Sequence, residues 1–321
     1  MQMSSPQRFK TSQEWNNFIA INPQLTGDDL LKIRHSCYAE IESIRNRPLI
    51  VYATRFLDSL PNTPNSIDLA DIDGFTDLVQ SIKDSDSVDV LIHSPGGRPD
   101  ATERIVHILR NRFKEVHFLV PHSAYSAATM LALSGNTITL HPSATLGPID
   151  PQINGIPARS IKKGFERVRE IIRIEGPESL PAYIPLIEKY SLDLLELCDD
   201  SEKLSKDLVS DWIKDFMLEG KERYEGQIEE SATFFSDYDT HLLHSRPLII
   251  SKLNKFDLNI SQSDEKLSEL IWEAYINLTG FFGLTSFVKL YENRHGVSWG
   301  KQFQQVVVQQ PSQGQVQHFP L

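Results

Sequence analysis

Two short segments carry residue types that together could perform acyl transfer. The segment HSPGG at residues 93–97 ends in two consecutive glycines after a β-branched run. Glycine has no Cβ, so its backbone N–H groups can face a substrate at close range. The segment AYSAAT at residues 124–129 places the Ser126 hydroxyl among small residues. A serine nucleophile beside N–H groups that hold an oxyanion is the core of a serine hydrolase.

Each segment alone has a simpler explanation. Gly96 and Gly97 suit a strand-to-helix turn that uses glycine for its geometry only. Ser126 suits an N-cap, which is a far commoner role for a serine at the start of a helix. The two segments are more specific together, because each follows a predicted strand and successive strand ends could place oxyanion donors beside a nucleophile.

The surrounding sequence predicts the elements that would position these residues. Short apolar runs predict strands at 48–53, 88–93, 116–120 and 137–140. Helical spacing of apolar residues predicts helices at 74–82, 101–113 and 125–133. This alternation is a βαβ progression and predicts a mostly parallel sheet with helices on its faces.

The remainder of the chain is predicted to be helical. Apolar residues recur at helical spacing over 160–172, 184–197, 204–218 and 267–282. We therefore divide the chain into an N-terminal helical segment at 1–47, a core at 48–153 and a helical extension at 154–300 that completes and covers the core. The glutamine-rich tail at 301–321 is predicted to be disordered.

Composition narrows the classes of function. The 321 residues include 32 Lys and Arg against 43 Asp and Glu, a net charge of −11, which argues against a broad nucleic-acid surface. Two cysteines, Cys37 and Cys198, are too few for a disulfide scaffold and suit a reducing compartment. No apolar run approaches the roughly 20 residues of a membrane span, and the polar N-terminus does not resemble a signal peptide. We expect a cytoplasmic protein.

The segment HSPGG, followed later by AYSAATMLALSGNTITLHPSATLGPIDPQI, resembles the Clp/crotonase-fold serine peptidases. Within that group it is most similar to the serine dehydrogenase proteinases, which are relatives of signal peptide peptidase A. The resemblance is strong over 88–153 and looser over 185–198, 237–244 and 291–296.

The resemblance implies an α/β fold of the Clp/crotonase type and ATP-independent hydrolysis of peptide bonds in a peptide or protein substrate. It implies Ser126 as nucleophile and the N–H groups of Gly97 and Ala127 as oxyanion donors, with Gly96 shaping the turn. Proteins of this fold usually self-associate, so a homo-oligomer is expected. No cofactor and no metal is implied.

The general base is the least defined part of this prediction. Clp-type peptidases carry a histidine near the position of residues 147–150, and this chain has none there. Relatives of signal peptide peptidase A use a downstream lysine, and the comparable residues are Lys162 and Lys163. Either could serve if burial left its amine neutral, whereas both could equally be solvated lysines on an amphipathic helix. Three histidines are further candidates: His93, His122 and His141.

Other interpretations stay open. Residues 237–244 gather carboxylates with His241 and His244, which could suggest a metal, although a loop packed over the site explains them more simply. A catalytically inactive scaffold or adaptor could keep the fold and lack the base. A crotonase-like acyl-CoA enzyme could use the same N–H groups to hold an enolate, and would give Ser126 no necessary role.

Overall fold

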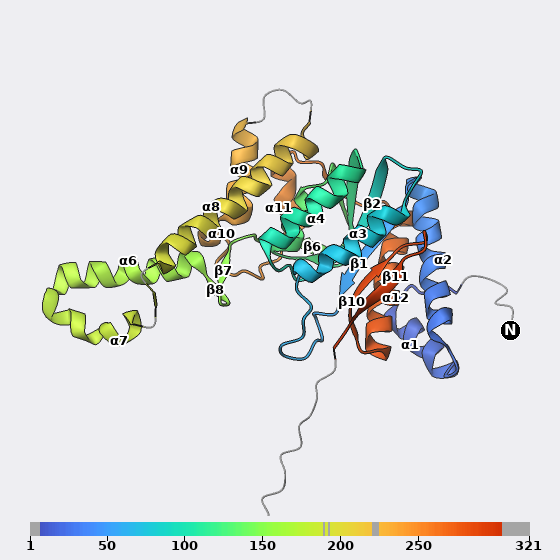
Figure 1. Cartoon of the computed structure of the whole chain (residues 1–321), viewed down its shortest axis with the longest axis horizontal. Helices are drawn as coiled ribbons and strands as arrows, with labels where there is room; N and C mark the ends of the chain where they lie inside the picture. Colours follow the sequence, from blue (N-terminus) through green and yellow to red (C-terminus); the bar gives the residue numbers. More distant parts are fainter. Residues whose placement is uncertain (1–6, 189, 192, 220–224, 304–321) are drawn as a thin grey trace, which may run out of the picture.

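The computed structural model describes residues 7–188, 190–191, 193–219 and 225–303 (Figure 1). The strands are β1 Leu49–Thr54, β2 Ser87–His93, β3 Glu115–Val120, β4 Ser123–Ala124, β5 Thr137–Leu140, β6 Thr145–Leu146, β7 Gln152–Ile153, β8 Ile156–Pro157, β9 Ile260–Gln262, β10 Phe287–Glu292 and β11 Ser298–Gln302. The α-helices are α1 Ser12–Ile21, α2 Gly27–Arg45, α3 Ile72–Ser81, α4 Pro99–Arg112, α5 Ala127–Leu133, α6 Ala158–Glu175, α7 Ile184–Ile187, α8 Leu194–Trp212, α9 Glu225–Ser236, α10 Tyr238–His241, α11 Ile250–Leu253 and α12 Glu265–Leu284.

A seven-stranded sheet in the order β11-β10-β1-β2-β3-β5-β9 forms the centre of the molecule. The strands from β1 to β9 in this order pair in parallel, whereas β10 and β11 are antiparallel to their neighbours. Every residue of β1 is buried, as expected for a strand covered on both faces. All four strands predicted from apolar runs are present in this sheet.

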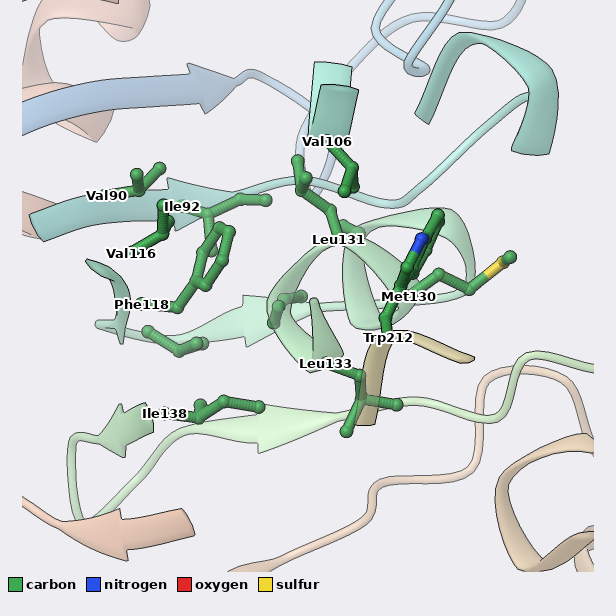
Figure 2. Close-up of a cluster of buried hydrophobic side chains, with 14 of the residues drawn as sticks. Val90, Ile92, Val106, Val116, Phe118, Met130, Leu131, Leu133, Ile138 and Trp212 are labelled. Carbon is green, nitrogen blue, oxygen red and sulfur yellow. The ribbon is translucent and has the colours of Figure 1, made fainter. Parts of the chain in front are cut away.

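Helices cover the two faces of the sheet (Figure 1). Val90 and Ile92 of β2 point to the face covered by α3, α4 and α5, whereas Leu91 between them points to α2 and α12. Side chains from β2, β3, β5 and α5 interlock in the first of these layers, and Trp212 of α8 packs beside Met130 (Figure 2). The C-terminal extension is thereby fastened to the helix that follows Ser126.

The extension differs from its predicted all-helical character. Helix α6 and the short α7 form an arm that leads away from the sheet, and α8 returns towards it (Figure 1). Three later strands, β9, β10 and β11, join the central sheet. They flank the long α12, whose helical periodicity dominated the sequence pattern there. The predicted disordered tail at 301–321 begins too early, because Lys301 and Gln302 belong to β11, and its residues after 303 lie outside the described part of the chain. Within the described part of the chain, no helix has the length and apolarity needed to cross a membrane.

A buried ion pair joins β10 to the segment that precedes α3. The Lys289 ammonium donates to both carboxylate oxygens of Asp71, at 2.8 and 3.0 Å, and to the Ser66 carbonyl at 2.6 Å. Tyr52 and Tyr291 also donate to the Asp71 carboxylate. Both charged side chains are fully buried, so each depends on the other to offset its lost hydration.

We predict that Asp71→Ala lowers the free energy of unfolding by about 3–5 kcal/mol, because it removes the buried partner of Lys289 and leaves that charge only the partly exposed Asp68 carboxylate, at 3.1 Å. Urea unfolding at neutral pH measures the loss. Asp73→Ala is the matched control, since Asp73 is exposed in the adjoining turn of α3 and its removal should leave stability close to wild type. Equal stability of the two variants would contradict this account of the ion pair.

Candidate active site

The two glycine- and serine-bearing turns meet at the carboxyl ends of β2 and β3. The Ser94 N–H donates to the Ser123 carbonyl at 3.2 Å, and the Tyr125 N–H donates to the Ser94 carbonyl at 3.1 Å. A Cβ on Gly96 would lie 2.3 Å from the Tyr125 carbonyl oxygen and 2.7 Å from the Ser126 Cβ. Only glycine therefore permits the two turns to approach this closely. The sequence predicted that the turns would lie close together, because they follow successive strands.

Gly96 and Gly97 have φ angles of +93° and +154°, a region that favours glycine. Ile67 fixes the turn from its outer side. Its N–H donates to the Gly96 carbonyl at 2.7 Å, and its carbonyl accepts from the Arg98 N–H at 2.9 Å. Because Ile67 bonds the residues that flank Gly97, the N–H of Gly97 itself points away from Ile67.

Ser126 has an unusual backbone conformation for a residue with a side chain. Its φ of 50° and ψ of −124° lie outside the regions that L-residues ordinarily occupy. It precedes α5, yet its side chain makes no capping hydrogen bond to that helix. The simpler N-cap explanation of this serine therefore does not account for its hydroxyl, and the residue is partly exposed. Strain of this kind is concentrated at functional sites.

Backbone donors surround the Ser126 turn. The Ala127 nitrogen lies 2.8 Å from where a Gly96 Cβ would be. As the first residue of α5, Ala127 has an N–H without an acceptor inside that helix. The Gly96 N–H instead donates to the Ser94 hydroxyl at 3.2 Å. This arrangement leaves Gly97 and Ala127 as the available donors and gives Gly96 a steric role.

The segment after β6 passes alongside the same turn. Strands β4 and β6 pair in parallel, with Ala124 opposite Leu146. A Cβ on Gly147 would lie 3.2 Å from the Tyr125 Cα, and the Gly147 N–H donates to the Thr129 hydroxyl at 3.0 Å. Gly147, the first of the residues 147–150 where the sequence lacks the expected histidine, is thus packed directly against the start of α5.

A histidine nevertheless reaches this segment from another part of the chain. The His244 Nδ1 lies 2.9 Å from the Asp150 Oδ1, and the Gln152 side-chain amide donates to the other carboxylate oxygen at 2.9 Å. The Asp150 side chain is 3% exposed and the His244 side chain 29%. Sequence reasoning missed this pair because His244 looked like part of a surface loop. Among the described residues, no cluster of His, Cys, Asp and Glu suits a metal ion.

The two predicted lysine bases have other partners. The Lys162 Nζ lies 2.5 Å from Asp199 and 2.7 Å from Glu202, both on α8. Lys163 is ion-paired with Asp239 of α10. The hydrogen bond to Asp199, followed in size by the one to Glu202, raises the pKa of Lys162 above its ordinary value. A lysine base must be neutral, which requires a lowered pKa. The carboxylates around Lys162 favour its charged form instead.

The other histidine candidates pack as rings on the α12 side of the sheet. His93 and His122 lie with ring centroids 5.1 and 4.8 Å from that of Tyr275, and His141 stacks on Trp272 at 4.8 Å. Burial, with a smaller contribution from nearby His122, lowers the pKa of His93 to about 3. His122 Nδ1 lies 2.7 Å from the Ser123 hydroxyl, not beside Ser126. These histidines therefore contribute mainly to packing.

A family model of ClpP-like SDH-type serine proteinases matches residues 15–275. The chain belongs to this family. The family and the parallel sheet confirm the expected Clp-type α/β fold.

Two proteins of Methanocaldococcus jannaschii are similar in sequence. MJ1495 is 30% identical over 188 residues, covering 57% of this chain and 56% of that protein. MJ0137 is 29% identical over 154 residues, covering 47% of this chain and 54% of that protein. Both are described as uncharacterised. The chain thus spans only a little over half the length of these curated relatives.

Solved structures show more distant similarity. A mutant of the 1510-N membrane-bound stomatin-specific protease has a TM-score of 0.37 and 18% identity, covering 63% of this chain and 77% of that one. A mutant of ClpP1 from Listeria monocytogenes has a TM-score of 0.38 and 12% identity, covering 71% of this chain and 99% of that one.

We predict that Gly96→Ala lowers the free energy of unfolding by about 1–3 kcal/mol, because its methyl group would overlap the Tyr125 carbonyl and its φ is unfavourable. Gly164→Ala is the control, since a Cβ there meets nothing within 4 Å in exposed α6. That variant should gain up to about 1 kcal/mol from helix propensity. Urea unfolding compares the two, and a harmless Gly96→Ala would contradict the tight contact.

We predict that His93 makes the protein less stable in acid. The unfolded chain binds a proton on this ring below its ordinary pKa of about 6.5, whereas the folded protein binds it only near pH 3. The stability contributed by neutral His93 is complete above pH 6.5 and is lost as pH falls, by up to about 1.4 kcal/mol per pH unit.

Urea unfolding between pH 7 and pH 4 tests this by comparing wild type with His93→Phe, which should show a shallower loss of stability. His107→Phe replaces an exposed histidine of α4 and should keep the wild-type slope. Parallel curves for wild type and His93→Phe would refute a neutral, buried His93.

Proposed function

We propose that this protein is a serine peptidase that hydrolyses peptide bonds without ATP, through an acyl-enzyme on Ser126. The observation that carries the proposal is the contact of Gly96 with the Ser126 turn, where no side chain fits between them. Membership of a family of serine proteinases supports the same reaction. The proposed substrate is a peptide or protein.

The chemistry follows from the groups around Ser126. Its hydroxyl attacks the carbonyl carbon of the scissile bond, and the carbonyl oxygen gains negative charge in the tetrahedral intermediate. The N–H groups of Gly97 and Ala127 are proposed to stabilise that charge, while Gly96 keeps the two turns in contact. Donors that are already in place lower the barrier because they need little reorganisation during the reaction.

Self-association and a cytoplasmic location are also part of the proposal. The arm of α6 and α7 carries exposed apolar side chains, including Ile174 at 70% and Leu186 at 55% exposure, which support contacts between copies of the chain. Both cysteines are buried free thiols, which supports a reducing compartment.

We predict that a fluorophosphonate probe forms one adduct with the wild-type protein and none with Ser126→Ala, because the probe needs an activated serine. Intact-mass spectrometry measures the adduct. Ser143→Ala is the matched control: Ser143 is exposed beyond β5, and its loss should leave labelling unchanged. Hydrolysis of a fluorogenic peptide should fall by about 10³-fold or more in Ser126→Ala alone.

The same experiment separates the rival functions. Folded wild-type protein that forms no adduct would exclude an activated Ser126 and favour an inactive scaffold. An unlabelled protein that converts an enoyl-CoA substrate would instead favour the acyl-CoA enzyme. For the base, Lys162 or Lys163 stays in the proposal as the sequence predicts, and the histidine of the His244–Asp150 pair is the alternative.

A further inference from the structure

We propose that the hydroxyl of Thr129 is a positioning group for the Ser126 nucleophile. It lies between the strand that leads into the Ser126 turn and the segment that follows β6, and it sets the separation of the two. This inference rests on the proposed serine peptidase function and deepens it. It adds a residue that acts through Ser126 and not through contact with the substrate.

The first argument is the pair of hydrogen bonds that Thr129 makes. Its hydroxyl donates to the Ala124 carbonyl at 2.7 Å and accepts the Gly147 N–H at 3.0 Å. A hydroxyl has one proton to donate, and the Ala124 carbonyl uses it. The Thr129 side chain is fully buried, so a substrate cannot reach either bond.

The second argument is the place of these bonds in the parallel pairing of β4 with β6. The Thr145 N–H donates to the His122 carbonyl at 2.9 Å, as expected for such a ladder. Groups that face the partner strand recur at every second residue, so an unbroken ladder would next join the Gly147 N–H to the Ala124 carbonyl. The Thr129 hydroxyl bonds both of these groups instead. It therefore replaces a direct ladder bond and holds the two segments further apart than that bond would.

The third argument is how the backbone around Ser126 is held. The φ of 50° at Ser126 is unfavourable, and such a conformation persists only where its neighbours fix it. The carbonyls of Tyr125 and Ser126 accept N–H groups of α5 at 2.9 and 3.0 Å, whereas the Ala124 carbonyl accepts the Thr129 hydroxyl. Of these three bonds, only the one from Thr129 depends on a side chain. It is therefore the bond that a substitution can remove.

The reach of this hydroxyl differs from that of an ordinary helical threonine. Such a hydroxyl usually bonds a carbonyl three or four residues earlier. Thr129 reaches five residues back, past the start of α5, to a strand. Thr285, between α12 and β10, shows the ordinary arrangement, since it donates to the Phe281 carbonyl at 2.9 Å and accepts the Phe287 N–H at 3.4 Å. Thr285 is therefore a matched control.

Loss of the Thr129 hydroxyl has two possible consequences. The Ala124 carbonyl and the Gly147 N–H either stay unpaired, which leaves the Ser126 turn less firmly held, or bond each other directly. A direct bond draws the two segments together and shifts Ser126 relative to the proposed oxyanion donors. In both cases the nucleophile is misplaced, and a displacement of about 1 Å can lower a rate by about 10²-fold.

The test measures the rate at which a fluorophosphonate labels Ser126 in the full chain, by intact-mass spectrometry. Thr129→Val keeps the shape of the side chain without the hydroxyl and should label about 10–10²-fold more slowly. Thr129→Ser keeps the hydroxyl and should label at close to the wild-type rate. Thr285→Val loses a comparable pair of bonds outside the Ser126 turn and should also match wild type.

A second measurement separates positioning from folding. Each variant is assayed at a temperature at which circular dichroism shows it to be folded. With a fluorogenic peptide, Thr129→Val should lower kcat and leave KM close to wild type, because the hydroxyl contacts no substrate. If Thr129→Val does not fold, Thr129→Cys takes its place, since a thiol forms weaker hydrogen bonds and should label more slowly than Thr129→Ser.

The outcomes distinguish the positioning role from the proposed function. Wild-type labelling of Thr129→Val, or of Thr129→Cys in its place, would overturn the role of Thr129. Labelling of Thr129→Ser as slow as that of Thr129→Val, an equal loss in Thr285→Val, or an effect confined to KM would also overturn it. Wild-type protein that is folded but unlabelled would overturn the proposed function itself.

Discussion

The site depends on the absence of a side chain at Gly96. The ends of β2 and β3 touch there with no space for a Cβ, and the adjoining Gly97 is equally confined, since a Cβ on it would lie 2.2 Å from the Ile67 carbonyl oxygen. The glycine turn is therefore compressed between Ile67 on one side and Ser126 on the other. Its positive φ angles turn the N–H of Gly97 away from Ile67. A parallel sheet provides this contact because the carboxyl ends of its strands all lie on the same side of the sheet.

The support for that turn extends to β10, two strands away from β2 in the central sheet. Ile67 holds Gly96 and Arg98, and the neighbouring Ser66 carbonyl is held by Lys289 from β10. Lys289 is in turn fixed by Asp71, so a buried ion pair between residues far apart in the chain anchors the outer wall of the glycine turn. Burying two charges costs hydration, which their attraction and hydrogen bonds offset only while both partners are present.

Sequence patterns predicted the parts of the molecule that depend on residues close together in the chain. Apolar runs located the four central parallel strands, and the succession of those strands was enough to predict that Gly96 and Ser126 meet. The pairing of β10 with β1 was missed because a late antiparallel strand has no local mark that links it to an early one. The contact of Asp150 with His244 was missed for the same reason, since it requires two distant segments to fold onto β6.

The lysines illustrate how neighbours, rather than residue types, decide a group's chemistry. A lysine at the start of a helix suits a base only where apolar surroundings remove its charge, and α6 meets acidic residues of α8 and α10 instead. Lys163 and Arg159 both bind Asp239, and α10, which contains Asp239, leads directly to the turn that carries His244. The positive charges of α6 are therefore already paired with acidic neighbours. An imidazole does not need apolar surroundings to act as a base, because it is largely neutral near pH 7. One buried carboxylate is enough to set its tautomer.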